Sequence, residues 1–463
     1  MSGRREPQIC LPGLGNASPA SIIVAASDTE SPRGAHLLWG RQPSWLGHDI
    51  AAGLSVAAVA LPIGVAYSDL VGVPAVYGIY SSIFPLLAYA IFGSSRQLIV
   101  GPDAATCLMV AASLAVLAGG DADRYLSLMV AVTLVTGALL VIAGIFRLGF
   151  IANFLSQPIL TGYLTGTALI IMVGQLPKLL GVPLDARGFF PQIAQLAGRL
   201  GQTHLPTLVL GGAMLLVLIA LKKLAPSLPS ALIVAAAGGV AVVLLNLQDV
   251  GVAVIGKVPS GLPAPHFALF DAPTGAALLR DAAGIVLLSF TSGMLTVKSF
   301  ARKNHYDVDA NQELIAFGAS NIASGLGQGV PVTGTGSRTA VNDSMGGKSQ
   351  LVGIIAAATM LMILLFFTAP LAFVPTTVLA AVILVSAYGL LDLAALRELW
   401  TMSHRELALC LITSLGVLVF GMLPGILIAI ALSLLWMLAV GSRPTEEVLG
   451  EVSELEGFFS LSH

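Results

Sequence analysis

Apolar runs long enough to cross a lipid bilayer recur along almost the whole chain, and no other feature restricts its fold so strongly. A helix needs about 20 apolar residues to span the hydrocarbon core. Only 10% of the 463 residues are charged and 56% are hydrophobic, whereas soluble domains carry about 25% charged residues. The chain cannot be soluble over most of its length, so we expect an all-α protein embedded in the lipid bilayer.

The apolar segments predict fourteen transmembrane segments. Two of them, 99–118 and 336–345, are short and are expected to be half-helices that follow extended, β-prone lead-ins. Residues 183–204 are predicted to form an amphipathic helix outside the membrane. The segments lie at about 50–68, 76–92, 99–118, 125–146, 151–176, 206–221, 229–247, 279–300, 312–327, 336–345, 350–369, 374–391, 406–422 and 424–441.

Composition divides the chain into five parts. Residues 1–47 are rich in Ser, Pro, Gly and Arg and hold no apolar run long enough for a signal peptide, so we expect a mostly disordered cytoplasmic tail. The Pro- and Gly-rich stretch 248–278 is interpreted as the connection between a first repeat, 48–247, and a second repeat, 279–441. Residues 442–463 are expected to be a cytoplasmic linker.

The distribution of Lys and Arg predicts the orientation in the membrane. With the N-terminus inside, fourteen of these residues fall in the inner loops and tails and six in the outer loops, as the positive-inside rule requires. Both termini are therefore expected in the cytoplasm of a multi-pass plasma-membrane protein, taken to be in a bacterial inner membrane. Seven segments per half is an odd number, so the two repeats must be inverted.

The two short segments predict the binding site. Non-helical backbone at membrane depth is tolerated only where it is buried in protein or lines a cavity, and a helix start there presents unpaired N–H groups and partial positive charge. Short, Gly- or Pro-interrupted segments at matching positions of two halves indicate a transporter's binding site. We predict that an anion binds between the facing helix starts, with these substrate-binding residues: Asp103, Ala104, Ala105, Thr335, Gly336, Ser337 and Arg338.

A simpler interpretation makes these stretches ordinary loops, with Arg338 extended toward a lipid headgroup. Against it, Arg338 lies within the short helix itself, and the next charge, Asp343, follows closely. Arg338 does not flank a long apolar run, so the binding-site interpretation is preferred.

Two acids in this region have two interpretations each. Asp103 either caps the helix that follows or pairs with Arg338, or it contacts the substrate and carries a coupling proton. Asp69 either lies solvated in an outer loop or is a proton-coupling carboxylate at the mouth of a cavity. Ionisable residues inside a membrane are costly and are functional candidates by default.

Other functional classes find little support in the sequence. The three cysteines lie far apart and the seven histidines form no metal pair, so neither a metal nor another cofactor is expected. A net charge of −2 gives no indication of a nucleic-acid partner. Neither an H-E-x-x-H motif nor a nucleophile-elbow motif is present, which argues against a membrane-embedded enzyme.

Four stretches carry a family resemblance. They are VYGIYSSIFPLLAYAIFGSSR (76–96), VGPDAA (100–105), DIAAGLSVAAVALPIGVAYSDLVGVP (49–74) and the block from YDVDANQEL to SQLVG (306–353). From about residue 45 to 450 the chain resembles the SulP family of anion transporters.

The resemblance implies a 7+7 inverted-repeat fold in which a core domain, segments 1–4 and 8–11, moves against a gate domain, segments 5–7 and 12–14. It implies elevator-type transport of a small anion held between segments 3 and 10, in a protein that commonly forms homodimers.

Two positions and the C-terminal end depart from the family pattern. Many relatives have Gln where Ile63 stands, so a polar substrate contact is missing, and sodium-coupled relatives have Asp where Ser292 stands, which leaves Thr296 as an oxygen ligand. Members usually continue into a STAS domain, whereas this sequence stops after RPTEEVLGEVSELEGFF, so no STAS domain is expected. Asp69, Asp103, Ser292 and Thr296 are the ion-coupling candidates.

The preferred hypothesis is a secondary-active, proton-coupled symporter of a small anion such as sulfate or bicarbonate. An uncoupled exchanger or channel on the same scaffold is the alternative. A nucleobase transporter of the same fold would favour Glu in segments 8 and 10, where Ser292 and Arg338 stand. The sequence leaves the identity of the anion open.

Overall fold

The computed structural model describes most of the chain between residues 43 and 460. The described residues are 43–421 except 154–156, 185, 187, 226–227, 265–271 and 403, together with 424–425, 428, 431–432, 449–451 and 458–460. Most of the expected N-terminal tail, of the last predicted segment (424–441) and of the C-terminal linker (442–463) therefore lies outside the described residues.

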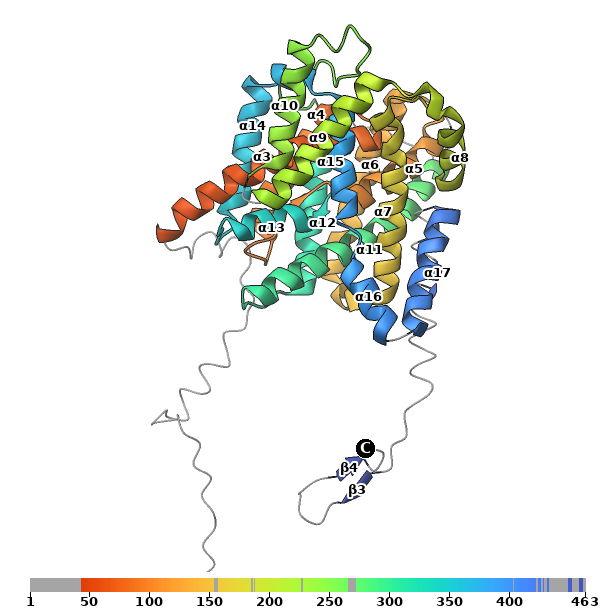
Figure 1. Cartoon of the computed structure of the whole chain (residues 1–463). Helices are drawn as coiled ribbons and strands as arrows, with labels where there is room; N and C mark the ends of the chain where they lie inside the picture. Colours follow the sequence, from red (N-terminus) through yellow and green to blue (C-terminus); the bar gives the residue numbers. More distant parts are fainter. Residues whose placement is uncertain are drawn as a thin grey trace, which may run out of the picture.

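The chain folds into a bundle of helices (Figure 1). Each of the first thirteen predicted apolar segments coincides with one helix. The α-helices are α3 (Leu46–Val71), α4 (Ala75–Phe92), α5 (Ala104–Leu117), α6 (Ala122–Ile145), α7 (Gln157–Leu180), α8 (Phe189–Arg199), α9 (Leu205–Leu224), α10 (Ser230–Leu244), α11 (Ala272–Lys303), α12 (Ala310–Leu326), α13 (Gly336–Ser344), α14 (Leu351–Phe366), α15 (Thr376–Tyr388), α16 (Leu393–Met402) and α17 (His404–Phe420). Short 3-10 helices are η1 (Pro43–Trp45), η2 (Leu148–Asn153), η3 (Leu200–Gln202) and η4 (Ala369–Phe373).

Seven stretches of helix among the described residues are long and apolar enough to cross a membrane. Shorter apolar helices, among them α5, α10 and α14, lie between them. One of the seven, Thr376–Thr401, runs across the turn that separates α15 from α16. A helical membrane protein is thus supported by length and composition.

Two helices differ from the sequence-based expectation. The amphipathic helix is shorter than 183–204 and begins at Phe189, because Gly188 adopts a left-handed conformation with φ 92°. Helix α16 was not predicted and falls in a stretch interpreted as a loop. Asp392 starts it by accepting a hydrogen bond from the backbone N–H of Ala395 at 2.8 Å, a capping signal that a search for apolar runs overlooks.

The helices pack into two groups. In the first group, α12 packs on α4 and α6, α14 packs on α3 and α4, and α11 lies against α6. In the second group, α7 packs on α15 and α17, and α9 packs on α15 and α10. The groups meet where α3 contacts α10 and α15, and where α5 contacts α7.

Two short strands cross inside the first group. Strand β1 (Val100–Gly101) pairs antiparallel with β2 (Thr333–Gly334), so that Val100 lies opposite Gly334 and Gly101 opposite Thr333. The predicted extended lead-ins are therefore confirmed, and the half-helices α5 and α13 begin directly after them. A second pair, β3 (Leu449–Glu451) and β4 (Phe458–Ser460), lies near the C-terminus of the sequence.

Candidate functional site

The starts of α5 and α13 lie side by side because the strands that precede them are paired. Asp103 is the N-cap of α5, and its Oδ1 accepts a hydrogen bond from the Thr106 N–H at 2.8 Å. Thr335, at the start of α13, makes no side-chain cap; its hydroxyl donates instead to the Ile99 carbonyl at 2.9 Å. The first N–H groups of α13 thus have no side-chain cap, which is the arrangement that suits an anion.

The first turn of α13 combines exposed and buried residues. Gly336 and Ser337 are exposed, whereas Arg338 is only 1% exposed. On the opposite helix, Ala104 and Ala105 are buried. Small residues on both sides let a ligand approach the backbone N–H groups.

Arg338 is the most unusual residue of this region. Both terminal nitrogens of its guanidinium are buried and have no hydrogen-bond partner among the described residues. A desolvated charge without compensation is expensive. The guanidinium lies against the backbone of Gly101, where any Cβ would overlap its Nη1. A buried cation that lacks a protein partner points to an anionic ligand.

Asp103, Tyr67 and Cys107 surround this guanidinium closely enough to interact with it electrostatically. Asp103 caps α5 and forms no salt bridge with Arg338 among the described residues. Of its alternative interpretations, the pairing with Arg338 is not found, and a contact with the substrate or a coupling proton stays a prediction. Tyr67 on α3 was not predicted as a site residue. Its position one helical turn after Ile63 was the available signal.

Side chains from the second half hold the lead-in before β1. The Ile99 N–H donates to Thr339 Oγ1 at 3.0 Å. The amide of Asn342 donates to the Gln97 carbonyl at 2.8 Å, and that of Gln350 donates to the Ser95 carbonyl at 2.7 Å. Extended backbone away from water needs such partners.

Asn321 on α12 does the same for the lead-in before β2. Its Oδ1 accepts from the Val332 N–H and its Nδ2 donates to the Val332 carbonyl, both at 2.9 Å. The Val330 N–H donates to Ser81 Oγ at 2.8 Å, from α4. A polar residue in an apolar helix was the sequence signal for Asn321, and the prediction missed it.

Two buried carboxylates fix the turns at the ends of these segments. Glu313 accepts from the Tyr89 hydroxyl at 2.8 Å and from the Ser94 hydroxyl at 2.6 Å. Asp49 accepts from the Lys348 N–H at 2.7 Å and from the Ser349 hydroxyl. Glu313 thereby anchors the GSS turn before β1.

Three of the remaining predicted residues lie on α3 and α11. Ile63 is buried in α3. Thr296 on α11 lies beside α13, since a Cβ on Gly336 would be 3.9 Å from its Oγ1. That hydroxyl donates to the Ser292 carbonyl at 3.2 Å. The structure therefore brings Thr296, with Ser292 one turn before it, to the start of α13.

Asp69 lies elsewhere. It is in the last turn of α3, where its Oδ2 is 2.6 Å from Lys178 Nζ of α7. The two side chains are 32% and 33% exposed. The interpretation of Asp69 as a fully solvated loop residue is wrong, because a second helix packs close enough to supply a cation.

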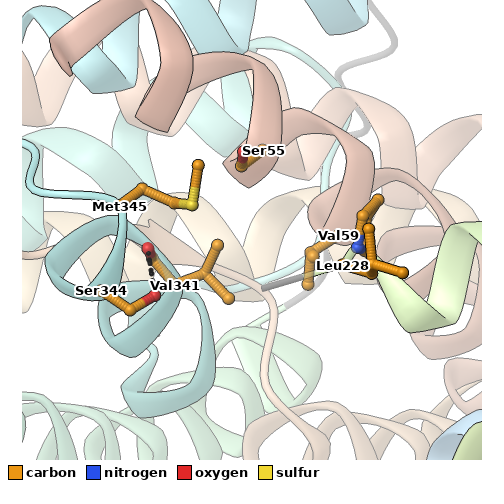
Figure 2. A pocket seen from close by; sticks show the side chains of 7 residues that line it. Ser55, Val59, Leu228, Val341, Ser344 and Met345 are labelled. Atoms are coloured by element: carbon orange, nitrogen blue, oxygen red, sulfur yellow. Dashed lines mark hydrogen bonds between the residues drawn. The ribbon is translucent and has the colours of Figure 1, made fainter. Parts of the chain in front are cut away.

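Two hollows lie where the packing groups meet. Figure 2 shows a pocket between the middle of α3, the end of α13 and the chain before α10. Its lining includes Ser55 and Val59, two turns and one turn before Ile63 on α3. An apolar cavity of ≈ 150 Å³ lies between α3, α10 and α15, and Leu61 and Val65 contribute to its wall. The contact between the groups is therefore incomplete.

Comparisons with known proteins agree with this geometry. The model of the sulfate permease family matches residues 46–413. A probable sulfate transporter of Mycobacterium tuberculosis (strain CDC 1551 / Oshkosh) is 40% identical over 420 residues, which cover 91% of this chain and 75% of the relative. Prestin of Danio rerio is 31% identical, over 90% of this chain and 60% of the relative.

Solved structures share the fold. The structure of SLC26A9 matches with a TM-score of 0.83 at 21% identity and covers 98% of this chain and 76% of that one. The transmembrane domain of a cyanobacterial bicarbonate transporter, BicA, matches with a TM-score of 0.74 at 22% identity, over 85% of this chain and 98% of that one.

Proposed function

Because the chain belongs to the sulfate permease family, we propose that it is a secondary-active transporter that binds a small anion between the starts of α5 and α13. The observation that carries this proposal is the buried guanidinium of Arg338, whose terminal nitrogens have no hydrogen-bond partner in the part of the chain that the structure describes. Sulfate and bicarbonate are the candidate substrates, since relatives are named for their transport. The anion would accept hydrogen bonds from Arg338 and from the first N–H groups of α13.

The proposed mechanism moves the site between the two sides of the membrane. The first packing group would act as a core that carries the anion, and the second as a gate against which it slides. The apolar cavity between α3 and α10 supports this motion, because a loosely packed apolar contact breaks and re-forms at little cost. We further propose a 7+7 inverted repeat of fourteen segments, a homodimer, and cytoplasmic termini in the plasma membrane.

Proton symport is the proposed mode of coupling. Asp103 lies near the Arg338 guanidinium, so an ionised carboxylate would repel the incoming anion, and a proton on Asp103 would remove that repulsion. The alternative is an uncoupled exchanger or channel. It is favoured by the hydrogen bond from Thr106 to Asp103, which gives this carboxylate a sufficient structural role.

Sulfate uptake into proteoliposomes tests the proposal. Bicarbonate and chloride serve as competitors, and an inward proton gradient is imposed at fixed membrane potential. Saturable uptake stimulated by the gradient would support proton symport. Uptake that ignores the gradient but responds to anions trapped inside would support exchange, and the absence of any saturable uptake of these anions would contradict the proposal.

A further inference from the structure

Helix α7 carries a buried polar face that the anion site does not use. Tyr163, Thr167 and Gln175 are all buried, and they recur at multiples of four residues. At 100° per residue they fall within about 120° of the helix circumference, together with Lys178. Polar side chains in a membrane helix commonly hydrogen-bond to a neighbouring helix, and intramembrane residues that are ionisable mark pathways for polar solutes.

The polar atoms on this face are poorly satisfied. The hydroxyls of Tyr163 and Thr167 lie next to each other, and neither has a hydrogen-bond partner of good geometry among the described residues. The Oε1 of Gln175 also lacks a partner there. Buried polar groups are normally paired. Three unpaired polar atoms on one helix face therefore indicate a surface that contacts a polar solute.

The two ends of this face lie against the first packing group. Tyr163 lies within electrostatic range of Asp103, and α7 contacts α5, the helix that Asp103 caps. Lys178, about four turns further along α7, forms the ion pair with Asp69 at the end of α3. The polar face therefore runs in the seam between the groups, from the anion site to a partly exposed ion pair.

We propose that this face of α7 lines the route between the anion site and the end of the bundle at Asp69, and that the Asp69–Lys178 ion pair closes the route. The proposal rests on the anion-transport function above. With the pair broken, Lys178 attracts the anion at the entrance, and the hydroxyls and amide of α7 replace water around it. The pocket at Ser55 and Val59 lies toward the other end of α3. In this structure an ion pair therefore lies on one side of the anion site and a pocket on the other.

Thiol labelling tests the route. Cys10, Cys107 and Cys410 are first replaced, and Gln175→Cys is then exposed in proteoliposomes to a charged, membrane-impermeant thiosulfonate. Leu176→Cys is the matched control, because it lies at the same depth but points about 100° away around the helix. We expect Gln175→Cys to react and Leu176→Cys to stay unreactive.

The ion pair is tested in the same background. Adding Lys178→Met should make Gln175→Cys react roughly two- to fivefold faster, the range expected for a partly exposed pair. Raised ionic strength should speed labelling in the parent and not in the Lys178→Met variant, since salt screens only an existing pair. The double exchange Asp69→Lys with Lys178→Asp should restore the slow rate.

The outcomes separate the route from the function. If Gln175→Cys stays unreactive in both backgrounds, or reacts no faster than Leu176→Cys, the route is wrong even where sulfate uptake is intact. If labelling follows the expected pattern, the route stands, and an absence of anion uptake then overturns only the proposed function.

Discussion

At the scale of single residues, the candidate site depends on one buried cation. Arg338 is the third residue of α13, and Thr335 at the start of this helix makes no side-chain cap. The guanidinium of Arg338 is packed against the backbone of Gly101. The charge is permanent, so the guanidinium itself always attracts anions. Asp103, close by and capping α5, is the group whose ionisation would modulate that attraction.

Gly101→Ala tests the position of the guanidinium. An added methyl would overlap Arg338 Nη1 and displace it, so we expect saturable anion uptake to fall by at least about tenfold, which corresponds to a loss of about 1.4 kcal/mol. The measurement is initial uptake per inserted protein. Gly212→Ala in α9 is the control, since nothing lies near that position; equal uptake by both variants would contradict the account.

Asp103→Asn tests proton coupling. The amide oxygen can keep the hydrogen bond from Thr106, and the amide mimics the neutral carboxyl. If the protonated form is the competent one, wild-type uptake rises as the pH falls, whereas uptake by the variant becomes independent of pH. The measurement is the uptake rate of both proteins from pH 5 to 8. If uptake by the variant depends on pH as uptake by the wild type does, Asp103 is a helix cap alone.

At the scale of elements, the sequence predicted the half-helices and their extended lead-ins because Gly and Pro interrupt apolar runs at matching places. It did not predict what holds those lead-ins. Glu313 and Asp49 each lie in the first turn of a helix, yet each is buried and fixes a turn from the other half of the chain. Such contacts join residues more than 200 positions apart, and no local pattern encodes them.

Site residues show the same division. Arg338 and Asp103 were found because a charge within an apolar context is conspicuous. Tyr67 and Asn321 were missed because an aromatic or an amide in a membrane helix is common. Helix α16 was missed because its amphipathic sequence resembles a charged loop between two apolar runs.

Asn321→Leu tests the support of the lead-in. The change leaves the N–H of Val332 without this partner, whereas the carbonyl of Val332 keeps the hydrogen bond from the Ser289 hydroxyl. An unpaired buried group costs about 1–3 kcal/mol. We expect a lower thermal unfolding midpoint in detergent. Thr359→Val should have little effect, because that hydroxyl bonds only within its own helix; a drop as large in the control would show that the lead-in contacts carry no special weight.

At the scale of the whole molecule, the two packing groups define what can move. The first group contains both half-helices and their anchors, so the proposed anion site lies within it. It meets the second group where α3 contacts α10 and α15, beside an apolar cavity, where α5 contacts α7, and at the ion pair of Asp69 with Lys178 of α7. Motion of one group past the other would carry the site without dismantling it.

Sodium replacement tests the coupling of the whole cycle. Ser292 and Thr296 supply hydroxyls but no carboxylate beside α13. Hydroxyls alone poorly compensate a sodium ion for the loss of its hydration water. Exchanging external sodium for an inert organic cation should leave the initial rate of anion uptake unchanged within error. A rate that falls in proportion to sodium would establish a sodium site that this account lacks.

The most direct test of the anion site is the stabilisation of the purified protein by anions. A ligand that binds only the folded state at 100 times its Kd stabilises it by about 2.7 kcal/mol, so the unfolding midpoint should rise with sulfate, bicarbonate or chloride at constant ionic strength. We predict a rise in the wild type for at least one of these anions and none in Arg338→Gln. An equal rise in both proteins would place the anion elsewhere and contradict the account.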